Sequence, residues 1–242
     1  MSRTIRCALA PLRPGRLSLP PEASRYLLKV HRLKVGQQFL AFDPEARLEA
    51  DATLVDDHHG KAACELGPPR SASLVSGLPV TLFQALGKGD KAERVVRDAT
   101  QLGVRRIVLV QTERSVPRVL DKRQTKQERY ERVAQEAARQ SGRGDVPTLE
   151  GPLSLAEALT LAHPLPIKLA FDAAAQANVR SVLSNRTSEL GVGALIGPEG
   201  GLSATELEAL MAAGFSLVRL GPFTLRTETA AIAALAVLSE YC

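Results

Sequence analysis

The sequence predicts an α/β domain with a parallel sheet, preceded by a small β-barrel-like domain. The pattern changes near residue 75, at the Pro-, Gly- and Ser-rich stretch LGPPRSASLVSGLP. Short segments that alternate apolar and polar residues precede it, whereas continuous apolar segments separated by helical ones follow it. Apolar strands joined through helices are typical of a parallel sheet covered on both faces. We therefore expect one domain at residues 1–72 and a second at residues 73–242.

The N-terminal domain has expected strands at GRLSLP, GQQFLAFDP and LEADATLV, each bounded by Gly, Pro or Asp residues. A helix is predicted from Glu22 to Leu33. Arg25, Lys29 and Arg32 recur at helical spacing and would form one basic face of that helix. The expected structure is a β-barrel with a single basic helix.

The C-terminal domain is expected to alternate strands and helices. VTLFQAL, RRIVLVQ, IKLAFD, GALIG and FSLVRLG are the predicted strands. Helices are predicted at DKAERVVRDATQLG, around ERYERVAQEAARQSG, and near the end of the chain. The last helix is almost entirely Ala, Ile, Leu and Val from Ala230 to Leu238, so we expect most of its surface to be buried.

The net charge of +5 conceals two basic blocks. Residues 1–36 and residues 88–143 each carry a net charge of +7, whereas residues 37–87 carry −4 and residues 144–242 carry −5. Each basic block alone could be a solvated helix face. Together they favour a polyanionic partner such as nucleic acid.

Other classes of protein find little support in the composition. No apolar stretch is long enough for a membrane span or a signal peptide, which predicts a soluble cytoplasmic protein. Three scattered cysteines and four dispersed histidines indicate neither a disulfide framework nor a metal site. Walker A, HExxH and nucleophile-elbow motifs are absent.

Two Gly-Pro pairs, at residues 197–198 and 221–222, end consecutive predicted strands. Open parallel sheets bind ligands at the carboxyl ends of their strands, where such loops lie. Gly lets the backbone approach a ligand closely and Pro stiffens the turn, so the two loops could build one pocket from opposite sides. Ser203 is the expected N-cap of the helix that follows the first loop, with Glu206 at its capping-box position.

The loop after the second Gly-Pro pair contains charged and hydroxyl side chains. Arg226 directly precedes the last helix, for which Thr227 is the predicted N-cap and Glu228 lies in the first turn. An arginine at the inner end of a packed helix usually has an anionic partner. We expect that partner to be Glu199, Glu228 or a bound ligand.

A competing motif is GKGDKA, from Gly87 to Ala92, which follows a strand and opens a helix. It matches the dinucleotide-binding pattern G-x-G-x-x-A, and Glu113 ends the next strand at a suitable distance. Lys88 and Lys91 in a phosphate-facing turn would equally suit an RNA backbone. A dinucleotide-dependent oxidoreductase is therefore an alternative function.

Four blocks, in order, resemble one known family: KGDKAERVVRDATQLGVRRIVLVQTERSV, ERVAQEAARQSGR, LIGPEGGLSATELEAL and LGPFTLRTETAAIAAL. The chain resembles the ribosomal RNA small subunit methyltransferase E family of the SPOUT superfamily. The resemblance implies a parallel sheet with a C-terminal deep trefoil knot that binds S-adenosylmethionine, after a PUA-like β-barrel that holds RNA. It also implies a homodimer that methylates N3 of a uridine in 16S rRNA of the 30S subunit. Tyr26 stands where the family pattern has a histidine.

The resemblance places the cofactor between the two Gly-Pro loops and the end of IKLAFD. Glycines suit that place, because backbone groups can recognise adenine only where no Cβ stands in the way. The implied cofactor-binding residues are Leu169, Phe171, Leu195, Ile196, Gly197, Glu199, Gly200, Leu220, Gly221, Leu225, Thr227, Thr229 and Ala230.

For the chemistry, N3 of uridine must lose a proton before it attacks the methyl group. We nominate Arg226 to orient the uracil or stabilise its anion, with Glu199 and Glu228 as proton acceptors or as groups that orient Arg226. A purely structural pairing of Glu199 with Arg226 is an equal alternative, and a non-catalytic RNA-binding protein on this scaffold is another. The expected RNA-binding residues are Arg25, Lys29, Arg32, Lys88, Lys91, Arg94, Arg114, Arg139 and Arg143.

Overall fold

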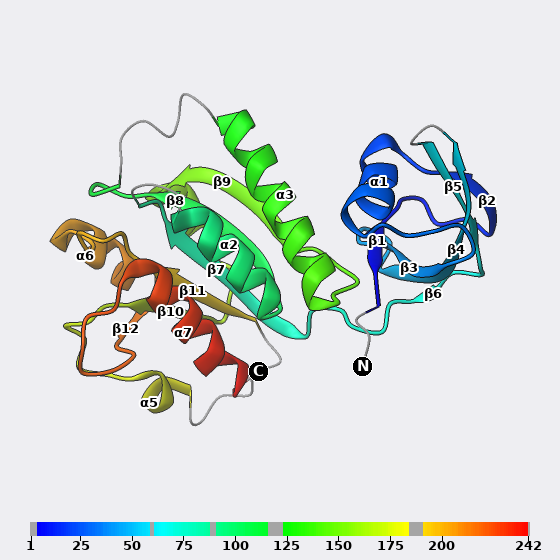
Figure 1. Cartoon of the computed structure of the whole chain (residues 1–242). Coiled ribbons are helices and arrows are strands. Elements are labelled where there is room, and N and C mark those ends of the chain that lie inside the picture. Colours follow the sequence, from blue (N-terminus) through cyan, green and yellow to red (C-terminus); the bar gives the residue numbers. More distant parts are fainter. Residues whose placement is uncertain (1–3, 59–60, 88–90, 116–122, 184–190, 242) are drawn as a thin grey trace. The chain divides into compact units, whose positions relative to one another are not determined.

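The computed structural model describes residues 4–58, 61–87, 91–115, 123–183 and 191–241, with the side chains of 123–126 excepted. The chain divides into two compact units (Figure 1). The first comprises residues 1–75 and 135–146, and the second comprises residues 76–134 and 147–242. Within the described ranges, every helix falls short of the length and apolarity that a membrane crossing requires.

The first unit is built on a mainly antiparallel sheet in the order β1-β3-β4-β5-β2, with β6 paired to β4. Among the strands that the structure describes in this sheet, only β1 and β3 pair in parallel. Leu27, Leu54 and Cys64 are fully buried in its aliphatic core. Its elements are β1 (Arg6–Ala8), β2 (Gly15–Ser18), α1 (Pro21–Arg25), η1 (Tyr26–Val30), β3 (Gln38–Asp43), β4 (Leu48–His58), β5 (Lys61–Leu66) and β6 (Arg70–Ser71).

The predicted helix from Glu22 to Leu33 is shorter than expected and changes type. An α-helical turn leads into the π-helix η1, in which the amide of His31 donates to the carbonyl of Tyr26 at 3.1 Å. Arg32 then takes a left-handed conformation, with φ of 53°, and ends the helix. The prediction of one continuous basic face was therefore wrong, because the wider π turn and the left-handed residue break the helical spacing.

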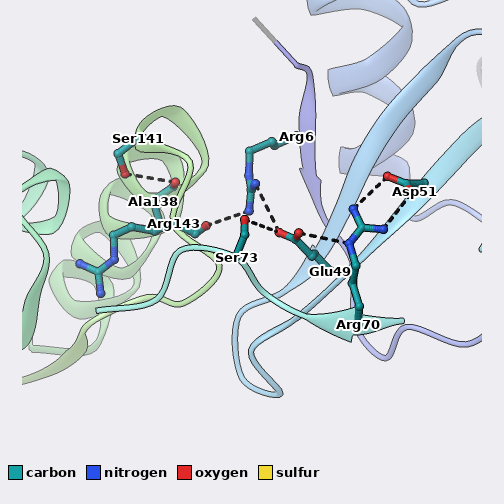
Figure 2. A network of polar contacts seen from close by, with 8 residues as sticks. All are labelled: Arg6, Glu49, Asp51, Arg70, Ser73, Ala138, Ser141 and Arg143. Carbon is teal, nitrogen blue, oxygen red and sulfur yellow. Dashed lines mark hydrogen bonds and ion pairs between the residues drawn. The ribbon is translucent and has the colours of Figure 1, made fainter. Parts of the chain in front are cut away.

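A polar network explains why residues 135–146 group with the first unit (Figure 2). Buried Glu49, on β4, lies 3.7 Å from a guanidinium nitrogen of Arg6 on β1 and 3.4 Å from one of Arg70 on β6. Arg6 also donates to the backbone carbonyl of Arg143 at 3.2 Å. The boundary expected at residue 72 placed residues 135–146 in the second domain, whereas the structure groups them with the first unit. The sequence does not reveal this grouping, since these contacts join residues far apart in the chain.

The second unit confirms the predicted parallel α/β sheet. Its strands follow the order β12-β10-β11-β7-β8-β9, and every pairing among them is parallel. Its strands are β7 (Leu78–Ala85), β8 (Val104–Gln111), β9 (Thr148–Ser154), β10 (Ile167–Phe171), β11 (Val192–Ile196) and β12 (Ser216–Val218).

Helices cover both faces of this sheet. Ala158 and Ala162 of α4 and Leu210 of α6 pack in one cluster with Phe83 and Val108 of the sheet. α2 and α7 pack against each other and against β7, β8 and β11, where Figure 1 shows them side by side in front of the sheet. The helices are α2 (Lys91–Gln101), α3 (Arg123–Ser141), α4 (Leu155–Ala162), α5 (Val179–Leu183), α6 (Ala204–Ala212) and α7 (Thr227–Ser239).

Candidate active site

A cavity of about 360 Å³ lies at the carboxyl ends of three adjacent strands, β12, β10 and β11. Three segments line it, one after each strand, as the rule for open parallel sheets predicts. Both Gly-Pro loops contribute to it, so the structure brings together the two segments that the sequence singled out. The lining residues are Phe171, Asp172, Ala173, Ile196, Gly197, Pro198, Glu199, Gly201, Leu202, Leu220, Gly221, Phe223, Thr224, Leu225, Arg226, Thr227 and Ala230.

The expected cofactor residues divide into two groups. Leu169 and Leu195 do not line the cavity, because their side chains are fully buried in the sheet. Gly200 and Thr229 do not line it either. The other nine expected residues do, namely Phe171, Ile196, Gly197, Glu199, Leu220, Gly221, Leu225, Thr227 and Ala230.

Sequence reasoning missed several lining residues that neighbour the expected ones. Asp172 and Ala173 continue the segment after β10, and Phe223 and Thr224 lie within the second Gly-Pro loop. Phe223 is the most exposed large apolar side chain of the described residues, at 78%. The sequence did offer a signal for Phe223, because an aromatic residue between a Gly-Pro pair and a helix is a candidate for a pocket wall.

Thr227 joins the two loops. Its hydroxyl donates to the carbonyl oxygen of Gly197 at 2.7 Å and accepts from the amide nitrogen of Gln84 at 3.0 Å. Thr227 and Gln84 are both buried, so these bonds are shielded from water. The prediction that Thr227 caps α7 was wrong: Arg226 is the N-cap residue, without a side-chain capping bond, and Thr227 is the first helical residue.

The loop after β11 is fixed from three sides. The capping box of Ser203 and Glu206 forms as predicted. Buried Glu206 also accepts the backbone amide of Glu113 at 2.8 Å, which ties α6 to the end of β8. Arg114 donates to the carbonyl of Gly200 at 2.6 Å. The loop is thus preorganised by residues from a distant strand.

A lysine, rather than Arg226, pairs with the carboxylates. Lys91 Nζ lies 2.6 Å from Glu199 Oε1 and 3.8 Å from Glu228 Oε2. Arg226 is exposed at the cavity and forms no ion pair within the described part of the chain. Of the three partners expected for Arg226, Glu199 and Glu228 pair with Lys91 instead, which leaves a bound ligand. Arg226 remains available to a ligand in the cavity.

The expected RNA-binding residues differ widely in exposure. Arg139 stacks on the ring of Tyr26 at 3.7 Å. Arg143 is only 6% exposed and pairs with Asp145 at 2.9 Å, so it lies in the interior and the prediction of an RNA contact there was wrong. Lys88 lies outside the described residues. The exposed members of the set are Arg25, Lys29, Arg32, Arg94 and Arg114.

The dinucleotide motif gains no support from the structure. Residues 88–90 lie outside the described residues, and Gly87, Lys91 and Ala92 do not line the cavity. A Cβ on Gly87 would come within 2.6 Å of the Glu199 carboxylate, so that glycine makes room for a side chain of the protein itself.

Known proteins of the same kind share both fold and sequence. The family model of the RNA methyltransferase domain matches residues 75–239. Ribosomal RNA small subunit methyltransferase E of Bacillus subtilis is 30% identical over 228 residues, which cover 92% of this chain and 89% of that protein. The Synechocystis enzyme of the same name is 33% identical over 88% of this chain and 69% of its own length.

Solved structures agree with this assignment. A Legionella pneumophila protein in complex with S-adenosylmethionine has a TM-score of 0.91 and 31% identity over 98% of both chains. Ribosomal RNA small subunit methyltransferase E from Neisseria gonorrhoeae, bound to S-adenosylmethionine, has a TM-score of 0.87 and 28% identity over 98% of both chains. The fold and the matched family model define an RNA methyltransferase. The chain belongs to the ribosomal RNA small subunit methyltransferase E family.

Proposed function

We propose that this protein transfers a methyl group from S-adenosylmethionine to N3 of a uridine in 16S rRNA of the small ribosomal subunit. The observation that carries the proposal is the cavity at the ends of β10, β11 and β12, lined by both Gly-Pro loops. Structural relatives with this fold bind S-adenosylmethionine. Curated relatives act on small-subunit rRNA, as their names state. We expect the protein to act in the cytoplasm, where its substrate is.

The described residues fit the cofactor. Two backbone-rich loops face each other across the cavity, which offers the amide and carbonyl groups that adenine recognition requires. Among the described residues, its two chain neighbours aside, a Cβ on Gly221 would meet no atom within 4 Å, so this lining glycine leaves space open for a ligand. At Gly197 a Cβ would come within 3.2 Å of the Leu202 side chain, which would have to shift to accommodate it. Phe171, Leu220 and Leu225 supply apolar walls.

S-adenosylmethionine would supply an electrophilic methyl group on a sulfonium. The protein's own task is to position the uracil and to deal with its N3 proton. Arg226, exposed and without an ion pair among the described residues, would stabilise the uracil anion. Glu199 or Glu228 would accept the proton directly or through water.

The RNA-binding surface would draw on both basic blocks. Arg25, Lys29 and Arg32 are exposed on the first unit, and Arg32 lines a second cavity of about 860 Å³ together with His31 and Lys34. We propose that this unit is the PUA-like β-barrel that holds RNA. Exposed Arg94 and Arg114 would serve the methyltransferase unit.

The trefoil knot and the homodimer belong to the same proposal. The bond from Thr227 to Gly197 joins the start of the last helix to the loop after β11, the two segments that would take part in the knot. α7 buries Ala231, Ala234 and Leu235 but leaves Val237 36% exposed. From Ala230 to Leu238 only Ala236 and Val237 are exposed, which agrees with the expectation that most of the helix surface is buried. A second copy of the chain would cover the remaining apolar face.

The test is mass spectrometry of nucleosides from 16S rRNA of a strain that lacks the protein. We expect 3-methyluridine to disappear with the deletion, to return with the wild-type chain, and not to return with Arg226→Ala. Calorimetry of the purified variant with S-adenosylmethionine separates lost chemistry from lost cofactor binding. Persistence of 3-methyluridine in the deletion strain would refute the proposed reaction and favour a non-catalytic RNA-binding protein.

A further inference from the structure

Three segments of the methyltransferase unit converge on the side chain of Lys91, the first residue of α2. Its ammonium lies 2.6 Å from Glu199, in the loop after β11, and 3.8 Å from Glu228, in the first turn of α7. Glu199 lines the cavity, and Glu228 directly follows the lining residue Thr227 in α7. Lys91 is thus the cation that both candidate proton acceptors share.

The surroundings make this arrangement specific. Gly87 leaves room for the Glu199 carboxylate, because a Cβ at position 87 would approach both carboxylate oxygens to 2.6 Å. The Glu228 side chain is only 11% exposed, and its Oε2 has no hydrogen-bond partner among the described residues. Two neighbouring carboxylates repel each other, more strongly where water is scarce. Removal of the lysine would therefore let the two loops move apart.

We propose that Lys91 is a positioning residue that holds Glu199 and Glu228 in place at the cavity and does not contact RNA. This inference rests on the proposed function. It replaces the expectation from sequence that Lys91 binds the RNA backbone, since the ammonium already has two protein partners. In this arrangement Lys91 acts on catalysis through the carboxylates.

The kinetic test compares Lys91→Met with Lys91→Arg on 30S subunits or 16S rRNA as methyl acceptor. We expect Lys91→Met to lower kcat on the order of 100-fold, because displaced catalytic groups cost about that much, while KM for RNA stays within about twofold. Lys91→Arg should restore much of kcat, since it keeps the charge. Lys61→Met is the matched control: it removes an exposed lysine from the first unit and should leave kcat and KM unchanged.

A second variant checks the geometry independently of the lysine. Gly87→Ala should lower kcat in the same way, because its methyl group would displace the Glu199 carboxylate. Arg94→Ala, one turn along α2 and 64% exposed on its side chain, should instead raise KM for RNA. The opposite result, a raised KM with unchanged kcat in Lys91→Met, would overturn the inference and make Lys91 an RNA contact.

The inference and the proposed function fail in different ways. If the wild-type chain methylates no uridine, the proposed function fails whatever Lys91 does. The pairing is then still tested by a double-mutant cycle of Lys91→Met and Glu199→Gln, read by the midpoint of thermal unfolding and by affinity for S-adenosylmethionine. Non-additive effects support the shared cation, whereas additive effects of the two substitutions would refute it.

Discussion

Thr227 illustrates how a single hydroxyl organises the candidate site. The hydroxyl donates a hydrogen bond to the carbonyl of Gly197 and accepts one from the side-chain amide of Gln84. It therefore contacts both the loop after β11 and the end of β7. From sequence, a threonine before an Ala-rich helix is most simply an N-cap. Only the positions of Gly197 and Gln84 in space give it a different role.

Thr227→Val should loosen the cavity without disrupting the fold. Valine has the same shape but removes the hydroxyl donor to the half-buried Gly197 carbonyl and one of the two acceptors of the buried Gln84 amide, which costs about 1–3 kcal/mol. We expect a lower thermal midpoint and weaker binding of S-adenosylmethionine, by roughly tenfold. Differential scanning fluorimetry and calorimetry measure these effects. Thr160→Val, on the exposed side of α4, should change neither.

Two buried thiols make the first unit sensitive to alkaline pH. Burial raises the pKa of Cys7 from its ordinary value of 9.0 to about 12, and that of Cys64 to about 11. In this range the unfolded chain loses protons that the folded chain keeps, so the free energy of unfolding contributed by the thiols falls as pH rises from about 9 to 11. Below pH 9 this contribution is fully present.

Urea unfolding at several pH values measures this effect. We expect Cys64→Ala to flatten the loss of stability between about pH 9 and 11. An unchanged slope in the variant would show that other groups, such as lysines and tyrosines, cause the alkaline loss.

At the scale of elements, the two faces of α7 differ in burial. One face packs on α2, β7 and β11, and the other leaves Val237 partly exposed. An Ala-rich helix read from sequence gives no indication which neighbour covers each face, because all its faces are apolar. The uncovered face is the expected contact between two copies.

Val237→Glu should therefore shift the protein toward monomer. A carboxylate in an apolar contact loses its hydration without gaining a partner, which opposes association. Sedimentation velocity over a range of concentrations measures the effect. Ser239→Glu, an exposed change close by on the same helix, is the control and should leave association as it is. A wild-type chain that is monomeric at all concentrations would contradict the dimer.

Other elements show why some strands and helices could be predicted from sequence and others could not. β8 and β10 are central apolar strands, and their patterns were sufficient. β9 was missed because Gly151-Pro152 lies within it, and such a pair normally interrupts a strand. Its position at the edge of the sheet tolerates the proline. The π-helix η1 was also missed, because no simple sequence period predicts it.

At the scale of the whole molecule, charge segregation predicts how the protein binds RNA. Five expected contacts are exposed, two of them in the second unit. Contacts with single-stranded RNA release about 0.7 counterion each, so five contacts would give a slope of about −3.5 for log affinity against log salt. Arg32→Ala and Arg94→Ala should each make this slope shallower by about 0.7.

Filter binding or fluorescence anisotropy with 16S rRNA fragments measures the slope. Arg143 offers a check on the same set, because the structure places it inside the first unit, paired with Asp145. Arg143→Ala should lower stability and leave the salt slope unchanged. If Arg143→Ala makes the salt slope shallower by as much as Arg32→Ala does, Arg143 belongs to the RNA-binding surface after all.

The sequence by itself determined the fold class, the change of architecture near residue 75 and the two Gly-Pro loops of the cavity. Each of these depends on local patterns: apolar periodicity, turn residues and capping signals. The tertiary structure alone decided that Lys91 rather than Arg226 pairs with Glu199, and that Arg143 is buried. Such pairings join segments far apart in the chain, and electrostatic attraction and burial depend on distance in space, which a single sequence does not encode locally.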